Sequence, residues 1–512
     1  MKKWVLFLLV TPLIFTSCQK KEVPTLVNLI PKDAKFVLAI DNEQIIKKGG
    51  FDKLSQFKFY QKLVESLDGN KNKDLILNVL DNPGKRGLNI NQAYLFMEMH
   101  GTNPLIVYVT AMKDKALFEQ NLIKLAELPA DQIQDKLTYR MFQKDEARLV
   151  WDDKLFFLFV GDVENINYDH YFRLQADESL MAQADFSEFV QRLSDIGLWL
   201  PMQTYADVLE MLSGLGAMDG VKIPMMNDMA GINMHLYLDF NNDEIKLEAN
   251  MTPKAAVDAM YDKYPVFKWN PNQDMLKDFP ETAYFVFKVA LDLPQYIKIL
   301  KQTMSEIDVH NSEMELVVDA LEDPTVNMVL NALGGDIIFS LYGFAEGPMA
   351  MPLLGLSLSV NSEADFQKLL AMIPKGIAQN NGRYYVLDFG VAAGYLAYKD
   401  NRVFATADEK SMETFLSGGN AKNITANAAI GKAMANSPSL FYINLNIDDY
   451  PKVIKDIAKS GYVDENVMAT IAMFKDFSVY MNSKYNVQAS LKFKSGKENS
   501  LKQLIKLIDS AN

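Results

Sequence analysis

The residue types that perform catalysis or bind metals form no established pattern in this sequence. No Gly-x-Ser-x-Gly motif presents a serine nucleophile, and acidic pairs such as Asp152-Asp153 fall between apolar runs, where a hairpin turn is expected. The histidines share no metal-ligand spacing; they are His100, His170, His235 and His310. Because no group of residues supplies a nucleophile, a base and an electrophile together, we predict no catalytic residue and no cofactor.

Two segments carry part of the pattern of a metal site. Asp239, Asn241 and Asp243 have the oxygen spacing that opens a calcium-binding loop, but Glu244 stands at the sixth position, where such a loop needs glycine. The alternating apolar residues on both sides predict a β-hairpin instead. Thioether and imidazole groups suit copper(I), whereas methionine also fills irregular apolar gaps. The methionines near histidines are Met97 and Met99 beside His100, and Met225, Met226, Met229 and Met234 beside His235.

The one thiol of the chain, Cys18, stands at the end of a signal peptide. Lys2 and Lys3 precede an apolar run from Trp4 to Phe15, and Thr16-Ser17 lead into Cys18. The run is too short to span a bilayer as a permanent helix. A thiol directly after a small residue resembles a bacterial lipobox. This resemblance implies a mature protein that begins at Cys18, is diacylated there and is tethered to a membrane.

The composition predicts an acidic protein that is held together by apolar burial. The chain has 52 basic and 65 acidic side chains, a formal net charge of -13, which becomes about -15 once Lys2 and Lys3 leave with the signal peptide. Such a charge repels phosphate backbones, so nucleic-acid binding is disfavoured. With Cys18 acylated, no thiol remains for a disulfide or a thiolate–metal site.

The body of the chain repeats itself at a nearly constant shift, which favours an internal duplication. We therefore divide the chain into a signal peptide (1–17), a tether (18–27), a first α+β repeat (28–270) and a second α+β repeat (271–512). The matches, with shifts of about 249, 248, 247 and 242 residues, are Pro31–Phe36 with Pro280–Phe285, Phe118–Leu122 with Phe366–Leu370, Trp151–Asp153 with Tyr398–Asp400, and Ile245–Ala249 with Val487–Leu491.

Each half shows the same succession of strands and helices. The apolar run Phe36–Ile40 ends at Asp41 and the run Phe285–Leu291 ends at Asp292, and both aspartates are placed to cap a following helix. Short apolar runs joined by tight turns predict antiparallel pairing, with a helix over Lys115–Leu128 between two hairpins. The predicted fold class is α+β: two tandem similar domains, each a hairpin-rich antiparallel sheet with helices packed mainly on one face.

The whole mature chain resembles the uncharacterised lipoproteins of Bacteroidetes-type bacteria that are classed as domains of unknown function. The resemblance is carried by Thr16-Ser17-Cys18, by the Ile30-Pro31-Lys-Asp-Ala34 opening and by the duplicated hairpin-helix-hairpin core. It implies a cell-envelope lipoprotein, and the family has no catalytic residues to transfer. Only Glu22 is acidic among the residues just after Cys18, which favours the periplasmic face of the outer membrane over surface display.

The expected role is that of a non-catalytic envelope lipoprotein that binds a protein or another envelope component. Two similar platforms would present a broad or pseudo-symmetric contact face. The alternative is a periplasmic carrier of lipid or another apolar ligand, for which methionine-rich linings would be suitable. Asp509-Ser510-Ala511, in a C-terminal tail that we expect to be disordered, resembles the acceptor pattern for O-glycosylation at Ser510 in proteins of the same bacteria.

Overall fold

The computed structural model describes residues 26–81, 86–101, 103–126, 132–204, 228–306, 319–347, 350–374, 376–388, 390, 393–460 and 465–511. Contacts divide the chain into two units. Unit 1 consists of the residues up to 205 together with Asn233–Pro253 and the residues from Ser495 onward, and unit 2 consists of 206–232 and Lys254–Lys494. The last helix, which we had assigned to the second half of the chain, therefore belongs to unit 1.

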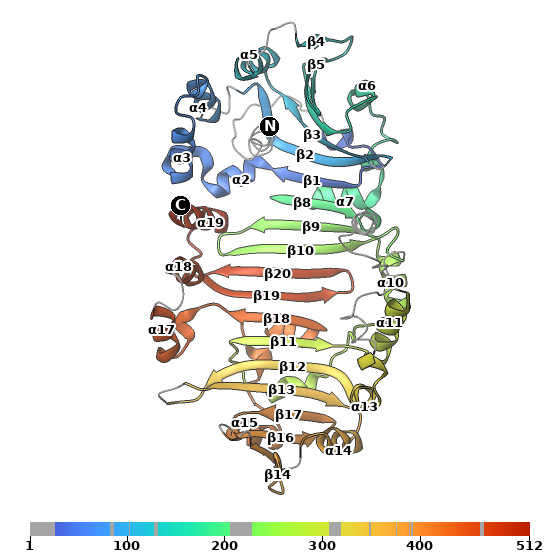
Figure 1. Cartoon of the computed structure of the whole chain (residues 1–512), viewed down its shortest axis with the longest axis vertical. Helices are drawn as coiled ribbons and strands as arrows, with labels where there is room; N and C mark the ends of the chain where they lie inside the picture. Colours follow the sequence, from blue (N-terminus) through green and yellow to red (C-terminus); the bar gives the residue numbers. More distant parts are fainter. Residues whose placement is uncertain are drawn as a thin grey trace. The chain divides into compact units, whose positions relative to one another are not determined.

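Unit 1 is built on an antiparallel sheet with the order β4-β5-β6-β7-β3-β2-β1-β8-β9-β10 (Figure 1). Its strands are β1 (Phe36–Asp41), β2 (Leu88–His100), β3 (Asn103–Met112), β4 (Gln134–Asp135), β5 (Arg140–Lys144), β6 (Ala147–Trp151), β7 (Leu155–Gly161), β8 (Ile196–Pro201), β9 (Asn233–Phe240) and β10 (Glu244–Thr252). Its helices are η2 (Leu26–Leu29), α2 (Asn42–Gly49), η3 (Phe51–Gln56), α3 (Lys58–Ser66), α4 (Lys73–Asp81), α5 (Lys115–Ala126), α6 (Tyr168–Phe172), η6 (Leu180–Ala182), α7 (Ala184–Arg192) and α19 (Ser500–Ala511).

Unit 2 has a second antiparallel sheet, with the order β14-β15-β16-β17-β13-β12-β11-β18-β19-β20. Its strands are β11 (Phe285–Ala290), β12 (Leu333–Phe344), β13 (Pro352–Val360), β14 (Ala378–Asn380), β15 (Tyr385–Asp388), β16 (Ala393–Lys399), β17 (Arg402–Thr406), β18 (Ser439–Asn444), β19 (Phe474–Ser483) and β20 (Asn486–Phe493). Its helices are α10 (Lys254–Lys263), η7 (Gln273–Asp278), α11 (Leu293–Glu306), α13 (Pro324–Ala332), α14 (Glu363–Ala371), α15 (Glu409–Leu416), η8 (Ile424–Ala426), α16 (Gly431–Asn436), η9 (Ile447–Asp449), α17 (Lys452–Lys459) and α18 (Glu465–Met473).

Helices and antiparallel strands together confirm the α+β class. The predicted aspartate caps are also confirmed: Asp41 Oδ1 accepts from Gln44 N at 3.0 Å at the start of α2, and Asp292 Oδ1 accepts from Gln295 N at 3.2 Å at the start of α11. Each carboxylate satisfies a backbone N–H that has no partner within its helix.

Helices pack against both faces of each sheet, over part of each face, so the prediction that they pack mainly on one face is wrong. In β7, Phe157 and Phe159 join the core and contact aromatic rings of α6, while Phe156 and Leu158 pack on the opposite face with Phe118 of α5. The physical reason is that β7 is apolar at every position from Leu155 to Val160. A strand without alternation needs cover on both sides. In unit 2, α14 likewise packs over Val403, opposite the core that contains Phe404.

The C-terminal segment is ordered, in contrast to the disordered tail we expected. Asp509 lies in α19, and its Oδ1 accepts from Phe59 N at 3.0 Å. The apolar side of α19 explains this order, because Ile505 packs in a buried cluster with Ile46, Leu54 and Tyr60. Ser510 is therefore part of a helix rather than of a free tail. Within the described ranges, no helix is both long and apolar enough to cross a bilayer.

Candidate functional site

Of the residues whose types could perform chemistry, those that the structure describes are not brought together. Cys18, His310, Met225 and Met226 lie outside the described residues. His100 ends β2, His170 lies in α6 and His235 lies in β9. Over the part of the chain that the structure covers, no three His, Cys, Asp or Glu side chains are arranged to hold a metal ion.

The segment with calcium-loop spacing is a hairpin, as its alternation predicted. β9 and β10 pair from Phe240↔Ile245 to Asn233↔Thr252. Asp239 accepts from Ser194 Oγ, and Glu248, further along β10, pairs with Arg192 and Lys246.

His235 belongs to a buried polar cluster in unit 1. Its side chain is 2% exposed, and Nε2 lies 3.3 Å from Thr252 Oγ1 and 3.8 Å from Asp185 Oδ2. Burial would raise the pKa of Asp185, but donors from His235, Trp199 and Asn233 outweigh it and lower the pKa. These groups satisfy one another within the packing of α7 against β8 and β9, which gives the cluster a structural role.

Glu98 is a buried acid that the sequence reasoning missed. It lies on β2, is 8% exposed and accepts from Tyr171 Oη at 2.9 Å. Burial raises the pKa of Glu98 to about 7, although the Tyr171 hydrogen bond acts in the opposite direction. Asp33 adds a smaller repulsion.

Unit 2 contains a buried ion pair on its core face. Arg402 Nη1 donates to Asp278 Oδ1 at 2.6 Å, and Ser357 Oγ donates to Asp278 Oδ2 at 2.7 Å. The side chains of Arg402 and Asp278 are 6% and 0% exposed. Burial raises the pKa of Asp278 to about 6 despite Arg402. With every group enclosed, this set cannot reach a substrate.

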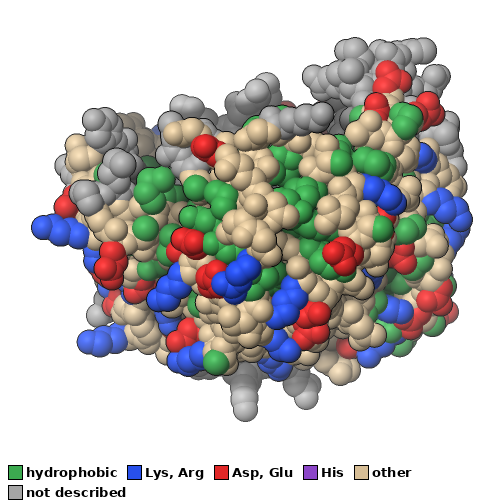
Figure 2. Space-filling view, turned by 90° about the horizontal axis from the view of Figure 1, so that it is seen from below, with side chains coloured by type: hydrophobic (Ala, Val, Ile, Leu, Met, Phe, Trp, Pro, Cys, Tyr) green, Lys and Arg blue, Asp and Glu red, His purple; other side chains and the backbone are tan. Residues whose placement is uncertain are grey.

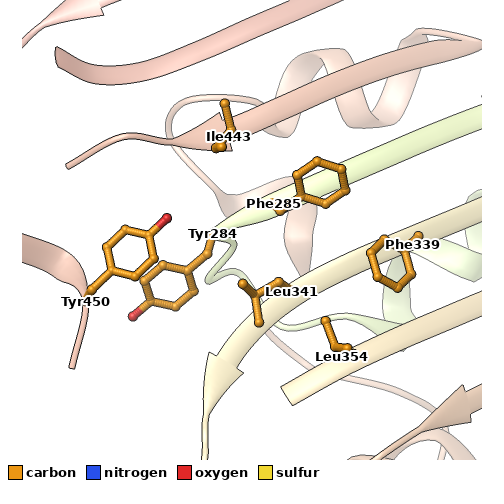
Figure 3. Close-up of a pocket in the computed structure, with 7 residues that line it drawn as sticks. All are labelled: Tyr284, Phe285, Phe339, Leu341, Leu354, Ile443 and Tyr450. Atoms are coloured by element: carbon orange, nitrogen blue, oxygen red, sulfur yellow. The ribbon is translucent and has the colours of Figure 1, made fainter. Parts of the chain in front are cut away.

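The opposite face of the unit 2 sheet carries a hollow of about 380 Å³ that is open to solvent. Figure 3 shows its lining, in which apolar side chains project from β11, β12, β13 and β18 while two tyrosine rings lie against each other at one end. The lining residues are Tyr284, Phe285, Phe339, Leu341, Leu354, Ile443 and Tyr450.

The only polar side-chain atoms of this lining are two hydroxyl groups, and both have partners. Tyr284 Oη donates to Asp449 O at 2.9 Å, and Tyr450 Oη donates to Asn444 O at 2.6 Å. Burial raises the pKa of Tyr450 to about 12, so this hydroxyl is protonated at neutral pH. The hollow thus offers a ligand apolar contact and almost nothing else.

We call the part of this face that is formed by β11, β12, β13 and β18, beside the part covered by α14, the open face. Phe287 is 41% exposed there, and Leu354 and Phe441 are each 36% exposed. The sequence signal was present, because Phe285, Val286 and Phe287 are apolar without alternation, but such a run is equally typical of a strand covered on both sides. Figure 2, which views one end of the molecule, shows basic and acidic side chains interspersed around hydrophobic ones.

Comparison with family models identifies one match, the domain of unknown function DUF4836, over residues 26–501. The chain belongs to the DUF4836 family. No curated protein matches it. A search of solved structures returned the Helicobacter pylori beta clamp bound to a DNA ligase peptide, with 8% identity over 79% of this chain and 89% of the clamp and a TM-score of 0.08.

The DUF4836 match covers both units, so the open face and the buried polar sets all lie within the family domain. In this DUF4836 chain, the hollow combines access from solvent with a lining of described residues. Its chemistry is apolar binding.

Proposed function

We propose that this protein is a non-catalytic cell-envelope lipoprotein that acts as a binding module. In this proposal, the acylated Cys18 holds the chain at the outer membrane, on the periplasmic face, and the open face of unit 2 is the contact surface. The supporting observation is the exposure of Phe287, Leu354 and Phe441 on neighbouring strands. Exposed apolar area is unfavourable by roughly 25 cal/mol per Å², and contiguous patches of it are typical of interaction sites.

We also propose that the chain consists of two duplicated domains, so that there are two such platforms. The identical strand order of the two sheets supports this. Unit 1 carries a matching cross-strand line of apolar side chains on the face opposite its α7-covered core. This line consists of Tyr108, Leu95, Leu38, Leu198, Leu236 and Ala249.

A second candidate function is that of a carrier of lipid or another apolar ligand. The observation that favours it is the hollow of about 380 Å³, which lies within the size range of small-molecule sites. A carrier would bind a lipid or another apolar small molecule at the open face, whereas a docking module would bind a protein or another envelope component there. The identity of what is crosslinked at the open face distinguishes the two.

The anchor is tested by Cys18→Ala, with Ser17→Ala as the matched control because alanine preserves a small residue before the thiol. We expect Cys18→Ala to move the protein from the membrane to the soluble fraction and Ser17→Ala to leave it in the membrane. Unchanged membrane retention of Cys18→Ala would contradict the anchor.

The contact surface is tested with a photo-crosslinking side chain at position 354 and, as a control, at Met372, which is 43% exposed but outside the hollow. We expect envelope components to be captured through position 354 only. Equal capture at both positions, or none at 354, would contradict a role for the open face.

A further inference from the structure

The C-terminal segment 495–511 docks on unit 1, although the strand that precedes it belongs to unit 2. The boundary between the units falls between Lys494 and Ser495. The chain is exposed on both sides of this boundary, from Lys494 to Lys497. The helix α19 is therefore held by the surface on which it lies, and a short exposed connection joins it to β20.

The surface beneath α19, which we call the α19 docking surface, is apolar at its centre. Its buried side chains are Ile46, Leu54, Phe57 and Tyr60, from α2, η3, α3 and the residue between the last two. Ile505 of α19 is buried among them, and Leu501 packs against the same cluster. At Gly49, which ends α2, an added Cβ would lie 3.1 Å from Ile505 Cδ1, so this glycine permits the close approach of α19. Leu501 and Ile505 are four residues apart and share one side of the helix.

Polar contacts fix both ends of α19 on this surface. At its start, Ser500 N donates to Asn241 O at 2.8 Å, beside the β9–β10 turn. Near its end, Asp509 Oδ1 accepts from Phe59 N at 3.0 Å. Asp509 follows Ile505 by four residues, so the apolar anchors and this acceptor lie on the same side of the helix. Anchors repeated along one side of a helix are typical of peptides that are recognised as helices.

The segment also carries the contacts that begin its own helix. Asn499 Oδ1 accepts from Leu501 N at 3.0 Å, and Gln503 Nε2 donates to Glu498 O at 2.8 Å. Lys506 Nζ lies 2.7 and 2.6 Å from the two carboxylate oxygens of Glu498. A helix of this length is marginal in water by itself. The segment therefore needs the docking surface in order to be stable, but it needs no contact from the strand that precedes it.

We propose that the α19 docking surface binds the same segment of a second copy of this chain, so that two copies exchange their C-terminal helices. Each contact described above lies within the segment or between the segment and unit 1, so a segment from another copy can form all of them. Exchange of an identical element is a low-cost route to a dimer. The chain's own segment competes through its short connection, which gives it an effective concentration on the order of millimolar. This inference is independent of the open face and of the anchor at Cys18.

The first test uses the mature chain with Cys18→Ala and Ile505→Asp, which releases its own α19, and a fluorescent peptide of residues 495–512 as the probe. We expect saturable binding of one wild-type peptide per chain. Ile505→Asp in the peptide should weaken binding roughly tenfold or more, because it puts a charge into an apolar contact. Ile508→Asp in the peptide is the matched control and should leave binding unchanged, because Ile508 is 52% exposed on α19.

The peptide series has clear contrary outcomes. Asp509→Ala in the peptide should weaken binding roughly fivefold through loss of the acceptor for Phe59 N. Absence of saturable binding to a chain that circular dichroism shows to be folded, or equal weakening by Ile505→Asp and Ile508→Asp, would overturn the inference.

The second test leaves both α19 and its docking surface intact, so it remains decisive if Ile505→Asp prevents folding of the chain. Deletion of Ser495, Gly496 and Lys497 shortens the connection by about 10 Å, so that α19 no longer reaches the docking surface of its own chain. We expect the shortened chain to sediment as a dimer at concentrations where the chain of natural length is a monomer. A shortened chain that remains monomeric would show that a second copy is not the partner.

Discussion

Replacing Glu98 by glutamine should make the protein more stable at alkaline pH and have a much smaller effect at acidic pH. The carboxyl group is 8% exposed, and its burial raises the pKa from 4.5 to about 7. A raised pKa means that the fold favours the protonated form. The stability contributed by this group is therefore complete below about pH 4.5 and is lost as the pH rises through about 7.

The size of the effect follows from the two pKa values of Glu98, 4.5 in the unfolded chain and about 7 in the folded protein. At about 1.36 kcal/mol per pKa unit, this difference corresponds to ~3 kcal/mol of unfolding free energy. Glutamine has nearly the same shape and cannot ionise, so Glu98→Gln should avoid this loss. The advantage of the variant over wild type should grow by about 3 kcal/mol between pH 4.5 and pH 8.

The assay is urea unfolding at a series of pH values, with hydrogen exchange of β2 and β3 amides to report on unit 1 separately. Glu146→Gln is the matched control, because Glu146 is exposed in the β5–β6 turn. Its difference from wild type should not change with pH. A Glu98→Gln advantage that is independent of pH, or a carboxyl titration of Glu98 near 4.5, would refute the reasoning.

Three further sets of variants test the buried ion pair, the buried Lys288 and the C-terminal helix. Arg402→Met should destabilise unit 2 by about 3–5 kcal/mol because it leaves Asp278 buried without its cation. The triple variant Asp278→Leu, Ser357→Val and Arg402→Leu, which replaces the whole polar set by apolar side chains, should be neutral or stabilising in chemical denaturation. Lys288 is 2% exposed, and burial lowers its pKa from 10.5 to about 8. Because the fold favours the neutral amine, wild-type stability should rise between about pH 8 and pH 10.5. Lys288→Met should remove that rise, as measured by denaturation curves at a series of pH values. Asp509→Ala should cost about 1 kcal/mol by removing the acceptor for Phe59 N at the start of α3, with Asp509→Asn nearly unchanged, as measured by hydrogen exchange over α3.

The parts of the fold that could be predicted from the sequence are those determined by local chemistry. Asp41 and Asp292 were identifiable as caps because a cap needs only a short polar side chain before free N–H groups. The hairpin around Asp152–Lys154 was identifiable from its turn residues and flanking apolar runs. The two-sided cover of the sheets was not, since a fully apolar strand such as β7 does not reveal which helix lies on each face.

The candidate site was missed for a related reason. Phe285 and Phe287 have the same composition as buried strand residues, and their exposure depends on which helices pack nearby, a property of distant segments. Glu98 was missed because a single acid at the end of an apolar strand is usually solvated. Its burial depends on Tyr171, which lies far along the chain. Sequence patterns identify what a side chain can do, whereas tertiary packing decides which side chains remain accessible.

The chain changes unit after β10 and again after β20. α10 follows β10 in sequence but belongs to unit 2, where Asp258 accepts from Tyr485 Oη at 2.8 Å beside the β19–β20 turn. α19 follows β20 but belongs to unit 1, where Asn499, just before the helix, donates to Phe240 O at 2.7 Å beside the β9–β10 turn. Each sheet thus has its terminal hairpin covered by a segment that the other half of the chain encodes. A chain cut at 270 would lose α19 and expose Ile46 and Tyr60, so we expect residues 28–270 expressed alone to unfold at a lower urea concentration than unit 1 does in the full chain.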